Sequence, residues 1–467
     1  MTRVLGRLMS LEMAVLGLCE LALSFLVIYG MLAMPGVLPA LAEASGVGAA
    51  HAASLGTANL AAMLALTIVC TAAAIGLYRP EICIERRRLL INAGVAGILA
   101  FPAVLVVSGS FHIGLSRHAV LLLSKVLVVW LVCILASRMI FNRIMRERWF
   151  IRRILVLGPA PRIARLRQLA AVGRGRLFEP VVAARDAGAG AVDQPLSPAT
   201  LRRQRIWGII VAGDFSDRDH ASMPMRSLLD CKLHGVPVLD EAAFCEQHLG
   251  RIDLDSIRAD WLLFADGFAV GRTSNAVKRG FDICVSLALL LLTLPLMLLT
   301  AFLIRIDSPG PVLYRQQRTG LRGTPFTLLK FRSMAIDAEK GGNPRWATQQ
   351  DPRITRLGSF IRPMRIDELP QLINVLRGEM SMVGPRPERP HFVEQLGRII
   401  PFYGERSYVK PGITGWAQVN YPYGASVEDA RQKLSYDLYY VKNRRLLLDL
   451  FILLATVRVI LFREGAR

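Results

Sequence analysis

Four long apolar segments open this 467-residue chain and constrain its fold more than any other feature. Each approaches or exceeds the roughly 20 residues that an α-helix needs to cross a bilayer. Because one apolar segment follows another and the first is long, a cleaved signal peptide is disfavoured. We therefore predict a four-helix transmembrane bundle over residues 1–148. The segments are Leu11–Met34, Ala52–Tyr78, Leu90–Ser110 and Ala119–Phe141.

Arginines on the flanks of these segments predict their orientation. Lys and Arg gather before the first segment and after the second and fourth, while the two other loops are nearly free of them. The positive-inside rule then places both ends of the bundle in the cytoplasm, as in a multi-pass protein of the inner membrane. Glu20 lies inside the first segment, where an acid can mark function; we favour packing within the bundle or a position near an interface. The flanking arginines are Arg3, Arg7, Arg79, Arg86, Arg87, Arg88, Arg138, Arg143, Arg146 and Arg148.

Residues 149–270 alternate short apolar stretches with amphipathic ones. This βαβ rhythm predicts a doubly wound parallel sheet, that is, a central α/β Rossmann-like domain. A dinucleotide site would need G-x-G-x-x-G after the first strand, but Gly158 is followed by Pro159 and Pro161. We therefore expect no NAD(P) and a structural or regulatory role. The expected strands are Ile154–Leu157, Val181–Ala184, Ile206–Ala212 and Val236–Leu239, and the expected first helix is Arg162–Val172.

A fifth apolar segment begins the last part of the chain, residues 274–467. Lys278 and Arg279 precede it and Arg305 follows it, so the positive-inside rule keeps both ends in the cytoplasm. Pro295 lies in its interior, where proline kinks or breaks a helix. We therefore predict a re-entrant membrane hairpin over residues 278–305. The later apolar stretch Leu446–Phe462 carries charges and is predicted to be an interfacial helix.

Two adjacent carboxylates, Asp367 and Glu368, stand before Leu369-Pro370 and a helical pattern closed by Gly378. We predict that they cap and open a helix, whose N-terminus would keep a carboxylate ionised. Carboxylates surrounded by guanidinium groups suit phosphoryl transfer, because arginine neutralises phosphate oxygens while a carboxylate attacks or binds Mg²⁺. The alternative is a plain acidic cap beneath a basic surface. The surrounding arginines are Arg353, Arg356, Arg362, Arg365 and Arg386.

The runs RIDELPQL, GPRPE and KPGITGWAQVN resemble the bacterial sugar transferase family, and the similarity extends from Lys278 to the C-terminus. Together with the N-terminal apolar segments, the chain resembles the large monotopic-type phosphoglycosyl transferases that initiate exopolysaccharide or O-antigen synthesis. The resemblance implies an α+β catalytic domain with a re-entrant membrane helix. It also implies transfer of a sugar 1-phosphate from a UDP-sugar to polyprenyl (undecaprenyl) phosphate. Tyr421–Gly424 and Gly465–Arg467 resemble the branch associated with exosortase and PEP-CTERM systems.

The same resemblance assigns roles to particular residues. Asp367 matches the nucleophile that forms a phosphosugar–enzyme intermediate, and Glu368 would bind Mg²⁺ with it or assist proton transfer. Lys330 and Arg332 match a basic pair of the family, with a solvated basic edge as the alternative. The family breaks its hairpin at Ser-Pro; here the pair is Leu294-Pro295, and the Thr293 hydroxyl is expected to satisfy the freed backbone group. The predicted phosphate-binding residues are Lys330, Arg332, Arg353, Arg362 and Arg386.

A formal charge of +21 points to anionic partners: nucleic acid, lipid or a phosphorylated substrate. Nucleic acid is disfavoured because no nucleic-acid motif accompanies the basic residues. A homo-oligomer stays open. Two other functions are considered. Membrane-bound nucleotide-sugar dehydratases need an intact glycine fingerprint and a Tyr-x-x-x-Lys pair, both of which are missing. A polysaccharide-export scaffold that has lost catalysis would tolerate the loss of Asp367.

Overall fold

The computed structural model describes two compact units, Met1–Leu249 and Gly250–Arg467, and each is treated by itself. The arginines Arg3, Arg7, Arg79 and Arg148, the predicted boundaries at 148 and 270, and the residues 422, 423 and 465–467 lie outside the described residues. The described residues are 11–34, 57–78, 86–110, 117–146, 151–170, 178–182, 197–212, 225–255, 271–335, 353–421, 424 and 426–461.

The four N-terminal apolar segments are helices, as predicted. Each contains a stretch that is long and apolar enough to cross a membrane. Helices α2 and α7 each contact both α5 and α8. Buried alanines such as Ala61, Ala65 and Ala96 line these contacts, and small residues let helix backbones approach closely. The helices are α2 (Leu11–Leu32), α5 (Thr57–Ala74), α7 (Arg86–Ser110) and α8 (Arg117–Arg146).

A buried ion pair joins the first and last of these helices. Arg138 Nη2 donates to Glu20 Oε2 at 2.9 Å, and the two side chains are 0% and 1% exposed. Ser137 Oγ donates to the other carboxylate oxygen at 2.9 Å. Glu20 therefore packs among the helices, as favoured above. Arg138 is among the flanking arginines from which the orientation is predicted. Because it is buried and paired with Glu20, it does not support that orientation.

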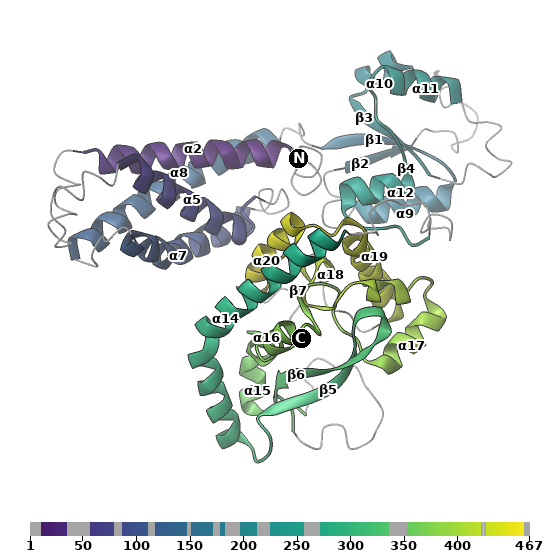
Figure 1. Ribbon diagram of the computed structural model, residues 1–467. Coiled ribbons are helices and arrows are strands. Elements are labelled where there is room, and N and C mark those ends of the chain that lie inside the picture. The colour runs from purple at the N-terminus through teal and green to yellow at the C-terminus, as the bar shows by residue number, and fades with distance from the viewer. Residues whose placement is uncertain are drawn as a thin grey trace. The chain divides into compact units, whose positions relative to one another are not determined.

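Four parallel strands form the sheet that follows, in the order β2-β1-β3-β4. Ile154 and Val156 of β1 pack with helices α9 and α12, whereas Leu155 packs with α10 and α11. Alternate residues of a strand point to opposite faces, so helices cover both faces of the sheet (Figure 1). The strands are β1 (Arg152–Leu157), β2 (Phe178–Val182), β3 (Ile206–Val211) and β4 (Val238–Asp240); the helices are α9 (Ala160–Ala170), α10 (Pro198–Arg203), α11 (Met225–Leu233) and α12 (Glu241–Phe244).

The turn after β1 has a glycine for a packing reason. A Cβ atom at Gly158 would lie 2.0 Å from the carbonyl oxygen of Ala212, just beyond β3. The carbonyl oxygen of Pro159 accepts hydrogen bonds from the backbone N–H groups of Arg162 and Ile163, in the first turn of α9. Gly158 thus serves strand packing. The expectation that this unit binds no NAD(P) stays a prediction.

In the second unit, the fifth apolar segment is one long helix, α14 (Arg272–Asp307), with Pro295 inside it. A straight helix of this length would extend about 54 Å. Yet both ends of α14 contact the rest of the second unit. Arg279, near its start, donates to the carbonyls of Val375 and Leu376, and Ile304, near its end, packs against Phe331. Figure 1 shows α14 bending along its length, as an internal proline can cause. The structure thus shows one bent helix that continues through Pro295, where a hairpin of two helices with a break was predicted; membrane re-entry stays a prediction.

One detail of the break was predicted wrongly. The hydroxyl of Thr293 donates to the carbonyl of Leu289 at 2.7 Å. Proline frees the carbonyl four residues before it, which is that of Leu291. Because the hydroxyl follows the ordinary bonding to residue i−4, it does not satisfy the freed group.

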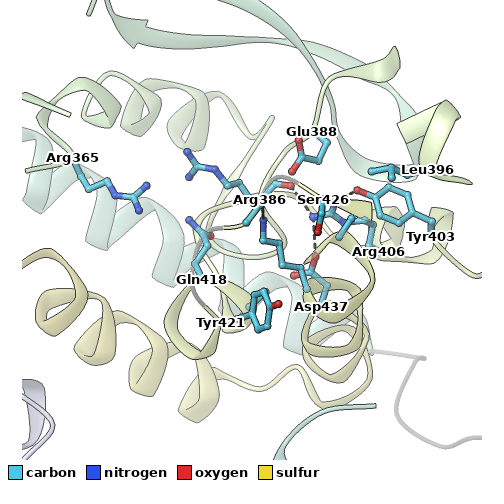
Figure 2. Close-up of a pocket in the computed structure, with 14 residues that line it drawn as sticks. Arg365, Arg386, Glu388, Leu396, Tyr403, Arg406, Gln418, Tyr421, Ser426 and Asp437 are labelled. Carbon is cyan, nitrogen blue, oxygen red and sulfur yellow. Dashed lines mark hydrogen bonds and ion pairs between the residues drawn. The ribbon is translucent and has the colours of Figure 1, made fainter. Parts of the chain in front are cut away.

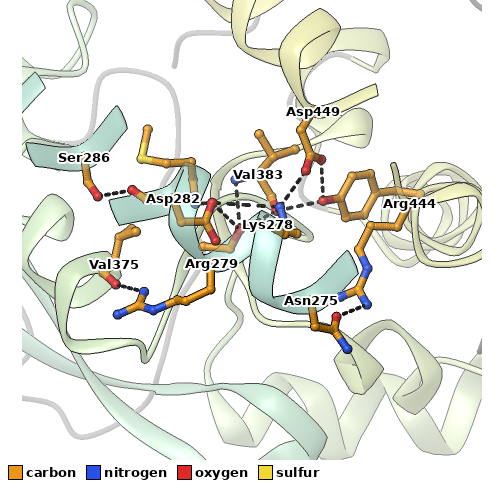
Figure 3. Close-up of polar contacts among 12 residues, drawn as sticks. Asn275, Lys278, Arg279, Asp282, Ser286, Val375, Val383, Arg444 and Asp449 are labelled. Carbon is orange, nitrogen blue, oxygen red and sulfur yellow. Dashed lines mark hydrogen bonds and ion pairs between the residues drawn. The ribbon is translucent and has the colours of Figure 1, made fainter. Parts of the chain in front are cut away.

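The base of α14 is joined to the rest of the unit by a buried polar network (Figure 3). Lys278 Nζ lies 2.7 Å from Asp449 Oδ2 and donates to the carbonyl of Val383 at 3.3 Å. Tyr440 donates its hydroxyl to Asp449 Oδ1 at 2.7 Å, and Asp282 accepts from the backbone N–H of Met382. The basic residues expected at the hairpin base therefore contact protein groups.

Helices and two small sheets complete the unit. Strand β5 (Leu313–Thr319) pairs antiparallel with β6 (Pro325–Phe331), and β7 (Ser381–Val383) pairs parallel with β8 (Gly412–Thr414). The last helix, α20, buries Asp449 but exposes Leu446, Leu450 and other apolar residues. An interfacial position for α20 stays a prediction. The helices are α15 (Arg356–Ile361), α16 (Gln371–Arg377), α17 (Pro390–Ile399), α18 (Trp416–Asn420), α19 (Val427–Asn443) and α20 (Leu446–Leu461).

Candidate active site

The two adjacent carboxylates lie in a short 3-10 turn, Ile366–Glu368. This corrects the expected cap, because Pro370 itself occupies the N-cap position of α16, and Gly378 ends that helix with φ 87° as expected. Arg365 precedes the turn with φ 59°, a left-handed conformation that is uncommon for a long side chain. Strained residues of this kind gather at functional sites, where the surrounding structure holds them.

Glu368 is buried among three cations that share one of its oxygens. Oε1 lies 2.6 Å from Arg386 Nη2, 3.1 Å from Lys330 Nζ and 3.6 Å from Arg365 Nη1. Burial alone would raise the pKa of this carboxyl, but the charges of Arg386, Lys330 and Arg365 hold the pKa well below its ordinary value. Glu368 is thus ionised and keeps the three cations together.

Asp367 has the opposite balance. Burial and then the charge of Glu368 raise its pKa to about 6, although Lys330, Arg362 and Arg386 act to lower it. The expected effect of a helix N-terminus is missing, since Asp367 does not cap α16. A carboxyl of this pKa is still mostly ionised at neutral pH. It is less stabilised than Glu368, and this suits a nucleophile better than a structural anion.

The structure brings some of the predicted phosphate-binding residues to this turn. Lys330 is partly buried there, with its side chain 20% exposed, and burial, only partly offset by the attraction of Glu368, lowers the pKa of its ammonium group. Arg362 follows α15 as its C-cap and acts on Asp367 through its charge. The backbone carbonyl of Arg353 accepts a hydrogen bond from Ala335 N at 2.9 Å, and this contact fixes the backbone at Arg353. A phosphate role for each of these residues stays a prediction.

Arg332 was predicted to join them and does not. Its guanidinium donates to the carbonyls of Ser308 and Pro309 at 2.6 and 2.9 Å, just beyond α14. Alternate residues of a strand point to the same face, so Arg332 would lie beside Lys330 if the strand continued; β6 ends at Phe331. Arg332 therefore fixes the end of α14 to β6.

A Mg²⁺ ion fits Asp367 better than Glu368. Mg²⁺ is commonly bound by one or two carboxylates and by substrate phosphates. Among the described residues there is no group of three or more His, Cys, Asp and Glu side chains that could hold a metal alone. Glu368 already has three cations on Oε1, and these would repel a divalent ion.

A pocket opens beside the acidic turn, where Arg365 and Arg386 line one end of it (Figure 2). Its wall continues through α18 and α19, which contribute Gln418 and Lys433. Few of these residues could be named from the sequence; Ala417 and Gln418 lie in the run KPGITGWAQVN, which carries the family resemblance. The lining residues are Arg365, Arg386, Glu388, Leu396, Tyr403, Arg406, Ala417, Gln418, Tyr421, Gly424, Ser426, Ala430, Lys433 and Asp437.

A second buried ion pair supports the floor of this pocket. Arg406 Nη2 lies 2.8 Å from Asp437 Oδ2, and Nη1 donates to the hydroxyl of Tyr403 at 2.7 Å. The Nη2 atom that pairs with Asp437 also donates to the backbone carbonyl of Arg386 at 3.0 Å. Arg406 therefore positions the segment that carries the closest cation to Glu368.

Comparison with known proteins gives the same family for this unit. A family model described as bacterial sugar transferase matches residues 273–463. The UDP-N-acetylgalactosamine-undecaprenyl-phosphate N-acetylgalactosaminephosphotransferase of Aeromonas hydrophila is 44% identical over 258 residues, 55% of this chain and 60% of that protein. The UDP-glucose:undecaprenyl-phosphate glucose-1-phosphate transferase of Xanthomonas campestris pv. campestris is 36% identical over 270 residues, 56% of this chain and 54% of that protein.

A shorter relative is matched over most of its length. The UDP-glucose:undecaprenyl-phosphate glucose-1-phosphate transferase of Caulobacter vibrioides is 44% identical over 191 residues, 40% of this chain and 71% of that protein. The chain thus spans little more than half of the two longer relatives. These relatives give no support for the exosortase-associated branch.

Proposed function

Because the chain belongs to the bacterial sugar transferase family, we propose that it transfers a sugar 1-phosphate from a UDP-sugar to a polyprenyl phosphate. The relatives described above are named for this reaction, with undecaprenyl phosphate as the acceptor. The observation that supports it best is the pairing of Glu368, which holds three cations and has a lowered pKa, with an adjacent Asp367 of raised pKa.

In the proposed first step, a carboxylate oxygen of Asp367 attacks the β-phosphorus of the UDP-sugar. The bond between the β-phosphorus and the bridging oxygen breaks, and UMP leaves with that oxygen. The enzyme then carries a phosphosugar on Asp367. In the second step a phosphate oxygen of the polyprenyl phosphate attacks the same phosphorus, the bond to Asp367 breaks, and the product is a polyprenyl diphosphate sugar. Splitting one displacement into two is the general benefit of covalent catalysis.

The cations around Glu368 have the charge that this reaction needs. Arg365 and Arg386 line the pocket and could neutralise diphosphate oxygens as the leaving UMP gains charge. Glu368 holds them in place. Mg²⁺, when bound through Asp367 and diphosphate oxygens, would add further positive charge at the leaving group. Glu368 would then act as a positioning residue rather than as a metal ligand.

We also propose where the reaction takes place. The four N-terminal helices would form a transmembrane bundle of the inner membrane, with a Rossmann-like domain after it. The catalytic unit would lie on the cytoplasmic face, with α14 re-entering the membrane from that side, because basic residues flank its apolar part. Exopolysaccharide or a related glycan would be the eventual product.

The test is UMP release by the purified full-length protein. With a UDP-sugar alone, the two-step route predicts one equivalent of UMP and a labelled protein, followed by turnover when polyprenyl phosphate is added. Asp367→Asn should abolish both the burst and the label while retaining folding and membrane insertion. Asp230→Asn, at an exposed position of α11, is the matched control. A requirement for both substrates before any UMP appears, or near-normal turnover by Asp367→Asn, would refute the covalent route.

The donor sugar follows from a panel of UDP-sugars with purified membranes and radiolabelled lipid as the readout. Conversion of a UDP-sugar without lipid labelling would instead favour the dehydratase. No turnover with any donor, together with normal polysaccharide export by Asp367→Asn cells, would favour the scaffold.

A further inference from the structure

The pocket contains a buried acceptor that the protein itself leaves without a partner. Oε1 of Gln418 is buried and accepts no hydrogen bond among the described residues. The other end of the same amide donates to the carbonyl of Ile413 at 3.2 Å. Because a carbonyl can only accept, this contact fixes the orientation of the amide: the NH₂ group faces Ile413 and the oxygen faces away.

Gln418 is held firmly in this position. It lies in α18, whose first residue, Trp416, is 1% exposed and donates its indole N–H to the carbonyl of Gly250 at 2.7 Å. The Trp416 ring stacks on Tyr439, with ring centroids 5.8 Å apart. A buried acceptor on a rigid element costs free energy unless a donor reaches it. Such an atom calls for a partner from outside the chain.

The chemistry of the pocket limits what that partner can be. Arg365 and Arg386, at the end near Glu368, suit phosphate oxygens. Phosphate oxygens only accept hydrogen bonds, so they cannot satisfy Gln418. Tyr421 lines the pocket as well, with its hydroxyl directed to Asp429 Oδ1 at 3.0 Å, so its ring is available as an apolar wall (Figure 2). A donor for Gln418 must therefore come from the uncharged part of a ligand whose phosphates lie on the arginines.

We propose that Gln418 is a specificity-determining residue whose amide oxygen accepts a hydrogen bond from an N–H or O–H group of the nucleotide sugar. This inference rests on the proposed function and deepens it. The donor has two possible sources with the same chemistry: the imide N–H of the uracil base, or a hydroxyl or amide N–H of the sugar. A site that hydrogen-bonds such a group rejects analogues that lack it, because its own buried atom is left unpaired.

The experiment compares wild type with Gln418→Met, which keeps the side-chain length and removes the amide. Gln317→Met, at an exposed position of β5, is the matched control. UMP binding is measured by titration calorimetry on the full-length protein in detergent. If the base is the donor, UMP should bind about tenfold or more weakly to Gln418→Met. Wild type should then also bind N3-methyl-UMP as weakly, and Gln317→Met should match wild type.

If the sugar is the donor, UMP binding stays unchanged in Gln418→Met, and the KM for the UDP-sugar rises by a similar factor. The same rise should appear for wild type with a deoxy-sugar analogue. Unchanged UMP affinity together with unchanged KM would overturn the proposal and leave an ordered water as the partner. The analogue comparisons use unaltered protein, so they decide the matter even if Gln418→Met does not fold. UMP binding needs no chemistry at Asp367, so repeating it with Asp367→Asn separates this inference from the covalent mechanism.

Discussion

Arg386 Nη2 lies 2.6 Å from Oε1 of Glu368, and the same guanidinium also opposes the rise in the pKa of the neighbouring Asp367 that burial and Glu368 cause. Two carboxyls adjacent in sequence thus have a common cation but opposite pKa shifts. Glu368 receives the direct contact, and Asp367 is left with burial and the negative charge of its neighbour. The difference assigns an electrostatic role to one and reactivity to the other.

The raised pKa of Asp367 predicts the pH dependence of the reaction. The nucleophile must be deprotonated, so kcat/KM should be constant near neutral pH and fall about tenfold per pH unit below the pKa of about 6. The measurement is initial rate against pH at low UDP-sugar concentration, with stability checked at each pH. A rate that stays flat down to pH 5 would show that Asp367 titrates lower or is not the attacking group.

Glu368→Gln should move that acidic limb. The negative charge of Glu368 raises the pKa of Asp367, so removing it should shift the limb to lower pH. The maximal rate should also fall, by about 10²-fold or more, because Lys330, Arg365 and Arg386 lose the group that holds them. The pH profile distinguishes this effect from general damage. Glu394→Gln, on the exposed side of α17, should behave as wild type; a limb that moves to higher pH contradicts the assignment.

The bent α14 predicts matching accessibility at its two ends. Ser274 and Asp307 are exposed, whereas Lys278 is paired with Asp449, so cysteines at positions 274 and 307 are the better probes. In a background without native cysteines, a membrane-impermeant thiol reagent should label both in inverted vesicles and neither in right-side-out vesicles. Labelling of one site in each preparation would exclude re-entry. Pro295→Ala should straighten the helix and lower activity.

The Lys278–Asp449 pair predicts a strong coupling in stability. Asp449→Leu leaves a largely buried ammonium group without its carboxylate and should cost about 3 kcal/mol. The double variant with Lys278→Met removes both charges and should recover most of the loss in thermal unfolding. Costs of the two single variants that simply add in the double variant would show that the contact contributes no interaction energy.

Some features could be predicted from sequence because they depend on local patterns. The apolar helices, the strands over Ile154–Leu157 and Ile206–Ala212, and the C-cap at Gly378 follow from hydrophobic periodicity and backbone preference. The prediction that Asp367 caps the following helix is wrong for a local reason as well, because Pro370 occupies the N-cap position of α16. The prediction that Arg332 joins Lys330 is wrong because the alternation of side chains stops where β6 ends, and no sequence pattern marks that end.

The pocket could not be predicted because its parts come from distant segments. Gln418 meets Arg386 only after β7 pairs with β8, and this register is set by tertiary contacts. The partnerless oxygen of Gln418 has no sequence signal at all. The motif that contains it could be recognised, but which of its atoms lacks a partner could not.

The pairing of β7 with β8 also limits how this enzyme could be redesigned. A Cβ atom at Gly384 would lie 2.3 Å from the carbonyl of Lys410, and one at Gly415 would lie 2.2 Å from the carbonyl of Gly384. The turn that carries Arg386 and the turn that leads to Gln418 are therefore pressed backbone to backbone, with no room for a side chain between them. Neither loop can be lengthened or reshaped without displacing the other. A change of donor sugar would have to come from the side chains that line the pocket, exchanged one at a time on a fixed frame.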